Sequence, residues 1–232
     1  GKMSGLEELC EGASNAAAEL GSAIASGNQI RIISHNDVDG ICSGTVVLLA
    51  VRGQGGSAHL RFSGHVYQED LADLLSTRPD FILFCDMGSD QISRLRKSKI
   101  PYLVIDHHAT ESRDEKLVNP YEFGVDGTRE VSASGVAYLV AKALNPENIS
   151  LSPIALCGAF GDMQILKGAN ERIATDAESK GLAKRRKEIR LIGRVDRPVE
   201  YSLCYSTLPF IKDLSGNPMA IRKFLGEIGV DV

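Results

Sequence analysis

The sequence predicts an α/β fold: a mostly parallel sheet flanked by helices, followed by a mainly helical C-terminal extension. Three observations support this prediction. Short β-branched or apolar segments alternate with helix-like segments through the first half of the chain, which is typical of a parallel sheet. Residues 81–85 and 102–105 are unbroken apolar runs, as expected of strands buried on both faces. From Val131 onward the pattern becomes helical.

The predicted elements follow in chain order. Residues 5–26 are rich in Ala, Glu and Leu and predict a helix. The β-branched run 29–34 predicts the first strand, and a small, apolar helix is predicted at 40–52. The remaining expectations are strands at 58–62, 81–85 and 102–105, and helices at 69–77, 91–97, 132–144, 152–160 and 218–228.

Composition excludes several classes of protein. No apolar run approaches the roughly 20 residues that a membrane-spanning helix needs, and the first residues lack the apolar stretch of a secretory signal. The five cysteines are widely spaced and form no C-x-x-C pair, so neither a disulfide framework nor a cysteine zinc site is expected. These features predict a cytoplasmic protein without a membrane partner.

The charge is unevenly distributed. The net charge of −4 argues against binding of nucleic acid through the overall field of the chain. Residues 184–197, however, carry seven basic and two acidic side chains. Two interpretations stay open for this stretch: a solvated helix face, or an arm that follows nucleic-acid phosphates and makes binding salt-dependent. The residues that would contact phosphates are Lys184, Arg185, Arg186 and Lys187.

Acidic and histidine side chains stand where three predicted strands end, and one more acid follows a predicted helix. They are His35, Asp37 and Asp39 after the first strand, Asp86 after 81–85, Asp106, His107 and His108 after 102–105, and Asp162 after 152–160. Ligands of open parallel sheets bind beyond the carboxyl ends of the strands, so we expect these groups to converge. Converging carboxylates repel one another by roughly 4 kcal/mol per pair at ~4 Å unless protons or cations neutralise them.

This donor set indicates a metal centre. Aspartate oxygens mixed with imidazole nitrogens suit Mn²⁺, with Fe²⁺, Co²⁺ or Zn²⁺ as alternatives. Four aspartates and two histidines are enough for two ions, the arrangement of phosphoester hydrolysis. A lone aspartate after a strand more often caps a helix, and on that interpretation Asp39 caps the helix 40–52. The four segments together, in this order, favour the metal interpretation.

At these residues the sequence resembles the DHH phosphoesterase superfamily. Its four motifs stand here as H-N-D-V-D-G at 35–40, C-D at 85–86, D-H-H at 106–108 and G-D at 161–162. Residues 132–138, 203–210 and 214–217 resemble the archaeal RecJ-like, GINS-associated branch. That branch is related to the bacterial single-strand exonuclease RecJ and to a cell-division-cycle subunit of the eukaryotic replicative helicase. The H-x-D-x-D spacing differs from the H-x-x-x-D-x-D of the inorganic pyrophosphatase branch.

The resemblance implies a role for each motif residue. His35 and Asp37 would hold one metal ion, and Asp86 would bridge two. A second ion would be completed by Asp39, His107 and Asp162. His108 would face the scissile phosphate as a catalytic group, and Asp106 would orient a histidine ring.

The resemblance also implies a function. We expect a metal-dependent phosphodiesterase, a RecJ-like exonuclease on single-stranded DNA or RNA, in which two divalent ions activate the attacking hydroxide. Mn²⁺ is the leading candidate, with Mg²⁺ or Co²⁺ as alternatives. Residues 1–165 would be the catalytic domain, and residues 166–232 a helical linker toward a substrate-binding domain whose Gly-Gly-Gly-His motif this sequence lacks. Two alternatives stay open: a phosphodiesterase of short oligonucleotides or cyclic dinucleotides, and a replication scaffold with little activity that binds the GINS complex.

Overall fold

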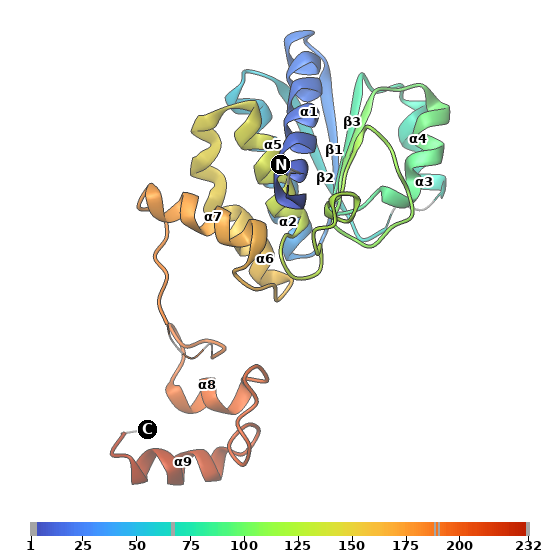
Figure 1. Cartoon of the computed structure of the whole chain (residues 1–232). Helices are drawn as coiled ribbons and strands as arrows, with labels where there is room; N and C mark the ends of the chain where they lie inside the picture. Colours follow the sequence, from blue (N-terminus) through green and yellow to red (C-terminus); the bar gives the residue numbers. More distant parts are fainter. Residues whose placement is uncertain (1–3, 66–67, 188, 190, 231–232) are drawn as a thin grey trace. The chain divides into compact units, whose positions relative to one another are not determined.

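The chain forms two compact units, residues 1–184 and residues 185–232, each with a hydrophobic core of its own. The computed structural model describes residues 4–65, 68–187, 189 and 191–230 (Figure 1). The structural boundary lies after the helix α7 (Gly168–Ser179), because Ile173, Ala174 and Ala177 of that helix are buried in the core of the first unit. The predicted boundary at residue 165 divides the chain by function, and that division stays a prediction.

The first unit is built on a five-stranded sheet with the order β2-β1-β3-β4-β5, in which all neighbours run parallel. The fold-class prediction is confirmed. The strands are β1 (Gln29–His35), β2 (Ser57–Ser63), β3 (Phe81–Cys85), β4 (Tyr102–Ile105) and β5 (Leu117–Val118). The last strand was not predicted, because two apolar residues are too short a run to show a strand period.

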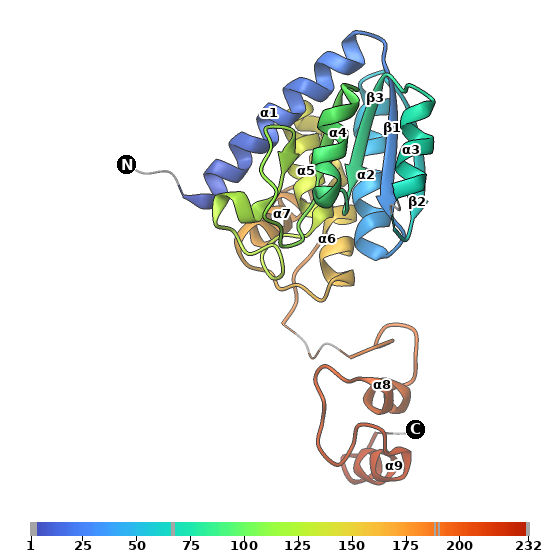
Figure 2. The same ribbon diagram turned by 90° about the vertical axis from the view of Figure 1, so that its right-hand side faces the viewer.

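Helices cover both faces of this sheet, as Figures 1 and 2 show. On one face lie α1 (Gly5–Ala25), α2 (Val38–Gly53) and α5 (Ala133–Leu144); on the other lie α3 (Gln68–Ser76) and α4 (Ile92–Ser98). Side chains along each strand point alternately to the two faces. Ile32 and Leu83 pack in the core beneath α1, α2 and α5, whereas Ile33 and Phe84 pack in the core beneath α3 and α4. Beyond α2 and α5 pack α6 (Ser152–Gly161) and α7. Three short 3₁₀ turns complete the unit, at Ser89–Gln91, Pro120–Phe123 and Pro146–Leu151.

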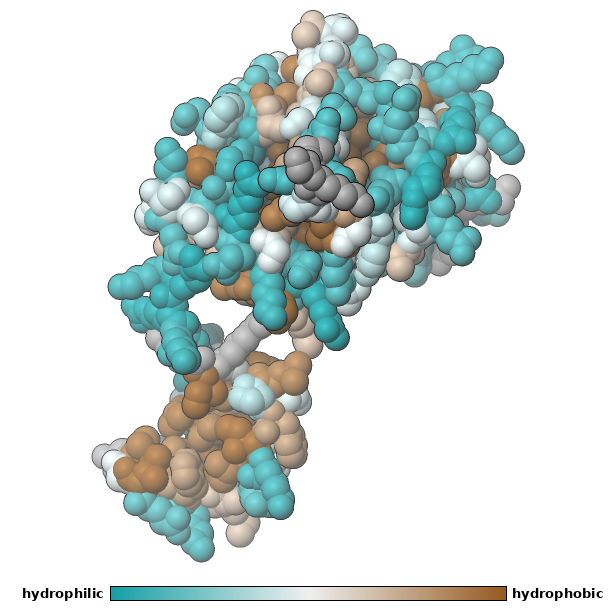
Figure 3. Space-filling model, viewed as in Figure 1, coloured by the Kyte–Doolittle hydropathy of each residue, from teal (hydrophilic) through white to brown (hydrophobic). Residues whose placement is uncertain are grey.

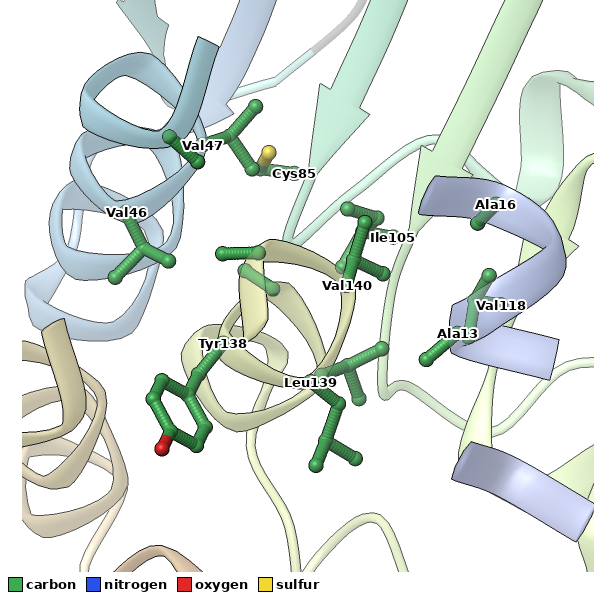
Figure 4. Packing of buried hydrophobic residues seen from close by; sticks show 14 of the residues in the cluster. Ala13, Ala16, Val46, Val47, Cys85, Ile105, Val118, Tyr138, Leu139 and Val140 are labelled. Carbon is green, nitrogen blue, oxygen red and sulfur yellow. The ribbon is translucent and has the colours of Figure 1, made fainter. Parts of the chain in front are cut away.

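The helix α5 lies at the centre of the larger core. Every residue from Ala133 to Ala141 is buried, because helices surround α5 and the sheet covers its remaining side. In Figure 4, Val140 of α5 points toward Ile105 of the sheet, while Tyr138 points away toward neighbouring helices. The Tyr138 hydroxyl donates to Asp176 at 2.8 Å, which satisfies its polar end. The start of α5 is therefore held rigidly beside the carboxyl ends of the strands.

The second unit is a small helical assembly of α8 (Val199–Tyr205) and α9 (Pro218–Glu227) around Leu203, Ile221 and Leu225. Its surface carries many apolar side chains (Figure 3). The helical character of this extension is confirmed. Residues 184–187 form no helix, so the interpretation of these positions as a solvated helix face is wrong; residues 188 and 190 lie outside the described residues. Among the described residues, no helix has both the length and the apolarity to cross a membrane.

Candidate metal centre

The carboxyl ends of the strands gather histidines and aspartates into three overlapping groups. Within each group, the potential ligand atoms lie within 4.8 Å of one another. The groups are His35 with Asp37 and Asp86, Asp86 with His107 and His108, and Asp39 with His107 and Asp162. The structure thus brings together all six residues predicted from the sequence as metal ligands. Asp86 and His107 each belong to two groups and link the cluster.

The first motif forms the turn from β1 into α2. The Oδ1 atom of Asp37 accepts the N–H of Gly40 at 2.8 Å, so Asp37 caps α2 and the helix begins at Val38. This corrects the alternative in which Asp39 is the cap. A Cβ atom at position 40 would lie 2.3 Å from the carbonyl oxygen of His35, so the turn requires glycine. The Nδ1 atom of His35 lies 2.8 Å from Asp37 Oδ2.

Asp39 is fully buried in the first turn of α2 and reaches the N-terminus of α5. Its oxygens accept the N–H groups of Ala133 at 2.7 Å and Ser134 at 3.0 Å. A helix N-terminus favours nearby acceptor oxygens, so these bonds fix the position of the Asp39 side chain. Asp39 Oδ2 lies 3.7 Å from Nε2 of His107. The Ser-Ala-Ser-Gly segment at 132–135, noted from the sequence only as a resemblance, therefore anchors a candidate ligand.

Asp86 is the least satisfied polar group at this edge. It follows β3 with a left-handed backbone (φ 58°) and is buried. Among the described residues, neither of its oxygens receives a hydrogen bond. They face Nε2 of His107 at 3.2 Å and Nδ1 of His35 at 3.5 Å. Burial raises the pKa of Asp86 to about 7, because the charged form lacks water; the interaction with His107 opposes that shift, and the charge of Asp39 adds to it.

His107 points one nitrogen into the cluster. Its Nδ1 lies 2.7 Å from the carbonyl oxygen of Gly127, which can only accept, so Nδ1 carries a proton and Nε2 faces the acids. Nε2 lies 3.3 Å from Oδ2 of Asp162, the residue after α6. Burial works to lower the pKa of His107, but Asp86 and Asp39 outweigh it and raise that pKa to about 9. Burial, then the charge of Asp39, raises the pKa of Asp162.

Both oxygens of Asp106 accept hydrogen bonds from the protein, and Asp106 belongs to none of the three groups. Oδ1 accepts the N–H of His107 at 2.8 Å and of His108 at 3.3 Å, and it lies 2.8 Å from Nδ1 of His108. Oδ2 accepts the N–H of Ser89 at 3.2 Å. Burial alone would raise the pKa of Asp106, but the bonds from His108 and Ser89 lower it. The His108 side chain is 60% exposed, so Asp106 presents an anchored ring to solvent.

A hollow adjoins the cluster. The hollow, of about 350 Å³, opens beside Asp86 and His108 and is also lined by His65 and Thr110. The predicted phosphate-contacting residues are exposed and lie where the chain passes from the first unit to the second; they are Lys184, Arg185, Arg186 and Lys187.

Sequence reasoning missed the residues that position the cluster from outside the motifs. The carbonyl of Gly127 orients His107, and the side-chain amide of Asn119 donates to the carbonyl of His108 at 2.9 Å. Close packing against Asp39 also requires glycine at 158, since a Cβ there would lie 2.5 Å from Asp39 Oδ1. No local pattern signals the first two contacts, because a backbone carbonyl and a lone asparagine occur anywhere in a loop.

These residues fit divalent cations. Buried carboxylate oxygens without donors are unfavourable unless a cation neutralises them, and Asp86 is in that position among the described residues. Imidazole and carboxylate ligands suit borderline and hard divalent ions such as Mn²⁺. The donor set does not select one of these metals.

Comparison with known proteins gives the family. Residues 29–161 match the family model described as the DHH family, N-terminal domain. An uncharacterised protein of Methanocaldococcus jannaschii is 35% identical over 214 residues, which cover 87% of this chain and 48% of that protein. The chain therefore spans about half the length of this curated relative.

Solved structures show the same fold at low sequence identity. The exonuclease RecJ bound to manganese has a TM-score of 0.62 at 20% identity, covering 90% of this chain and 54% of that chain. A DHH domain described as belonging to a family of ribosomal proteins has a TM-score of 0.63 at 24% identity, covering 78% and 50%. CDC45 from Entamoeba histolytica has a TM-score of 0.57 at 14% identity, covering 99% and 52%. Identities this low show the fold alone.

Proposed function

This chain belongs to the DHH family, and on that premise we propose that it is a metal-dependent phosphodiesterase acting as a RecJ-like exonuclease on single-stranded nucleic acid. The observation that supports the proposal most is Asp86. It is a buried carboxylate that accepts no hydrogen bond among the described residues, and it faces His35, His107 and His108. A cation at this position relieves the unfavourable burial, and paired cations are suited to phosphoester hydrolysis.

The proposed ligand sets follow the geometric groups. His35, Asp37 and Asp86 would hold one ion, and Asp39, His107 and Asp162 the other, with Asp86 between them. When bound, two divalent ions supply positive charge that activates water and stabilises charge on a phosphoryl group. We propose Mn²⁺ first, with Mg²⁺ or Co²⁺ as alternatives. Gly127 and the N-terminus of α5 keep His107 and Asp39 oriented before any ion binds.

His108 is the proposed catalytic side chain. Its exposed ring borders the hollow beside Asp86, and Asp106 fixes the orientation of that ring. The hydrogen bond with Asp106 raises the pKa of His108, which favours the protonated ring. A protonated ring can donate a hydrogen bond to a non-bridging phosphate oxygen, where charge develops during hydrolysis.

The chain spans about half the length of its curated relative, so the substrate and the partners of the whole protein are also proposals. We propose single-stranded DNA or RNA as substrate, with Lys184, Arg185, Arg186 and Lys187 as phosphate contacts, and the GINS complex as a protein partner. Short oligonucleotides are the competing substrate class, since the same metal cluster serves them. Comparing dinucleotides with 20-mers separates the two substrate classes, and co-purification with GINS tests the partner.

The test of the proposed function is hydrolysis of end-labelled single-stranded DNA, RNA and dinucleotide by the purified chain with Mn²⁺, Mg²⁺ or Co²⁺. We expect metal-dependent release of mononucleotides, abolished in Asp86→Asn. The matched control is Asp196→Asn, which changes an exposed acid of the second unit (73% exposed) and is expected to keep full activity. Turnover by Asp86→Asn at the wild-type rate would refute the assignment.

A further inference from the structure

A second cavity lies on the other face of the sheet, between α3 and the strands β1 and β2. Its volume is about 380 Å³, within the range of about 300–1,000 Å³ typical of small-molecule sites. The apolar part of its lining combines the half-buried Leu74 of α3 with the buried core side chains Ile33, Phe84 and Leu71. None of the six candidate metal ligands lines it, so this cavity is separate from the metal cluster.

Basic side chains line the strand side of this cavity. Arg31 of β1 pairs in register with His59 of β2, and Arg61 lies two residues further along β2. Side chains two residues apart on a strand share a face, so all three groups project toward α3. Arg31 is unusual there, because its neighbour in register on β3 is the fully buried Ile82. An apolar residue is the expected choice at such a position in a parallel sheet covered on both sides.

The two arginines of this cavity are its candidate anion-binding groups. Arg31 is half-buried, yet within the described part of the chain the guanidinium group of neither Arg31 nor Arg61 forms an ion pair or a hydrogen bond. Two guanidinium groups on one face, one of them partly removed from water, repel each other unless an anion lies between them. Guanidinium groups bind phosphate with paired hydrogen bonds, so phosphate is the anion that this arrangement favours.

The opposite wall has a different chemistry. Asp70 and Asp73 of α3 line the cavity, and among the described residues neither forms an ion pair with Arg31 or Arg61. Carboxylates accept hydrogen bonds from amino and hydroxyl groups and repel a second phosphate. A ligand that fits this cavity therefore carries one anionic end, an apolar part that can contact Leu74, and hydrogen-bond donors at its other end.

We propose that this cavity binds a nucleoside monophosphate, with its phosphate on Arg31 and Arg61 and its base on the apolar lining beside Asp70 and Asp73. His65 lines both this cavity and the hollow beside the metal cluster, so the two sites are neighbours. Binding does not depend on the proposed function; only the source of the nucleotide, as product or as part of a bound strand, rests on it.

The test is calorimetric titration of the full chain with 5′-AMP, 5′-CMP and inorganic phosphate in EDTA, which removes metal from the other site. We expect one nucleotide per chain, bound at least tenfold more tightly than inorganic phosphate. Arg31→Leu and Arg61→Gln should each weaken nucleotide binding at least tenfold, while the matched control Arg52→Ala, on the exposed end of α2, should not. Because Arg31→Leu removes a half-buried charge that forms no ion pair among the described residues, the melting temperature of this variant should not fall.

The outcomes separate this proposal from the proposed function. Absence of saturable binding in EDTA, or unchanged affinity in both arginine variants, overturns the proposal. Loss of nucleotide binding in Asp86→Asn also overturns it, since the nucleotide would then occupy the metal cluster. Arginine-dependent binding in a chain that hydrolyses nothing supports this site while refuting the proposed function. Displacement of bound 5′-AMP by an oligonucleotide identifies the ligand as a unit of a strand; displacement by mononucleotides alone identifies the free nucleotide.

Discussion

The neighbouring strands β3 and β4 are each followed by a buried aspartate, but the two carboxylates differ in the hydrogen bonds that they receive. Asp86 and Asp106 are both 2% exposed. Asp106 accepts hydrogen bonds from three backbone N–H groups and contacts the His108 ring, and its pKa is lowered. Asp86 accepts no hydrogen bond among the described residues and faces histidine nitrogens, of which Nε2 of His107 at 3.2 Å is the nearest, and burial raises its pKa to about 7. Protein donors satisfy the hydrogen-bonding capacity of Asp106, whereas the oxygens of Asp86 remain available to a cation.

The largest expected effect comes from removing the charge of Asp86. Asp86→Asn keeps the volume but removes the charge that would hold a cation, so metal-dependent hydrolysis should fall by about 10³-fold or more. The metal-free melting temperature should stay constant or rise, because the substitution eliminates a buried charge that lacks donors. Activity assays and thermal melts measure both effects. A melting temperature several degrees below wild type would show that Asp86 is a structural group like Asp106.

Metal affinity should rise steeply with pH. Burial raises the pKa of Asp86 to about 7, and the neighbouring acids raise that of His107 to about 9 against the effect of burial. Both groups must lose a proton to bind metal, so affinity should increase by about tenfold per pH unit for each proton displaced. Mn²⁺ titrations between pH 6 and 9 test this dependence. An affinity independent of pH would contradict the proposed ligands.

The same shifts set the stability of the metal-free chain. Both folded-state pKa values lie above those of the unfolded chain, so these groups contribute stability that is present at low pH and lost as pH rises through about 7 and about 9. Stabilisation by metal should therefore grow over this window, and melts with Mn²⁺ or EDTA at each pH measure it.

Replacing Asp106 should affect both stability and activity. Asp106→Asn places an amide among several N–H donors, so the free energy of unfolding should fall by about 1.5–3 kcal/mol. Activity should fall by about 10–100-fold, because the His108 ring loses its anchor. Denaturant unfolding and single-turnover rates measure the two effects. A full loss of activity in a stable variant would place Asp106 among the metal ligands.

A smaller effect tests the anchoring of Asp39. Gly158→Ala would place a methyl group 2.1 Å from Ser134 Oγ and 2.5 Å from Asp39 Oδ1. We expect the free energy of unfolding to fall by about 1–3 kcal/mol. Gly53→Ala is the matched control, since a Cβ there meets nothing within 4 Å. Equal stability of the two variants would contradict the tight packing of Asp39 against α6.

The smallest effect concerns the basic segment. Replacing Lys184, Arg185, Arg186 and Lys187 with Ala should leave the rate on a dinucleotide unchanged. On single strands, the slope of log affinity against log salt should shrink by about 0.7 for each phosphate that the variant no longer neutralises. An unchanged slope would remove these four residues from the proposed nucleic-acid interface.

The sequence predicted the sheet well and the helical periphery less well. Strands β3 and β4 have the predicted bounds, because unbroken apolar runs mark strands buried on both faces. The helix α7 was missed because its buried face consists mainly of alanines and Asn170, which give little apolar contrast. Helix α2 begins two residues before its predicted start, because Asp37 rather than Asp39 is its cap.

The clustering of the candidate ligands was predictable, but their separate environments were not. Parallel strands place His35, Asp86 and His107 at one edge, which follows from the order of the motifs. Whether an aspartate there receives hydrogen bonds depends on donor groups that are distant in sequence. Asp39 finds its donors 94 and 95 residues away, at the start of α5. No local pattern distinguishes such an aspartate from Asp86.

The most direct test is calorimetric titration of Mn²⁺ into the metal-free chain at pH 8, with wild type, Asp86→Asn and Asp106→Asn compared. Wild type is expected to bind two ions per chain. Asp86→Asn should lose at least about 100-fold in affinity, while Asp106→Asn should still bind Mn²⁺. Wild-type affinity and stoichiometry in Asp86→Asn would contradict the claim that this buried carboxylate is held for a cation.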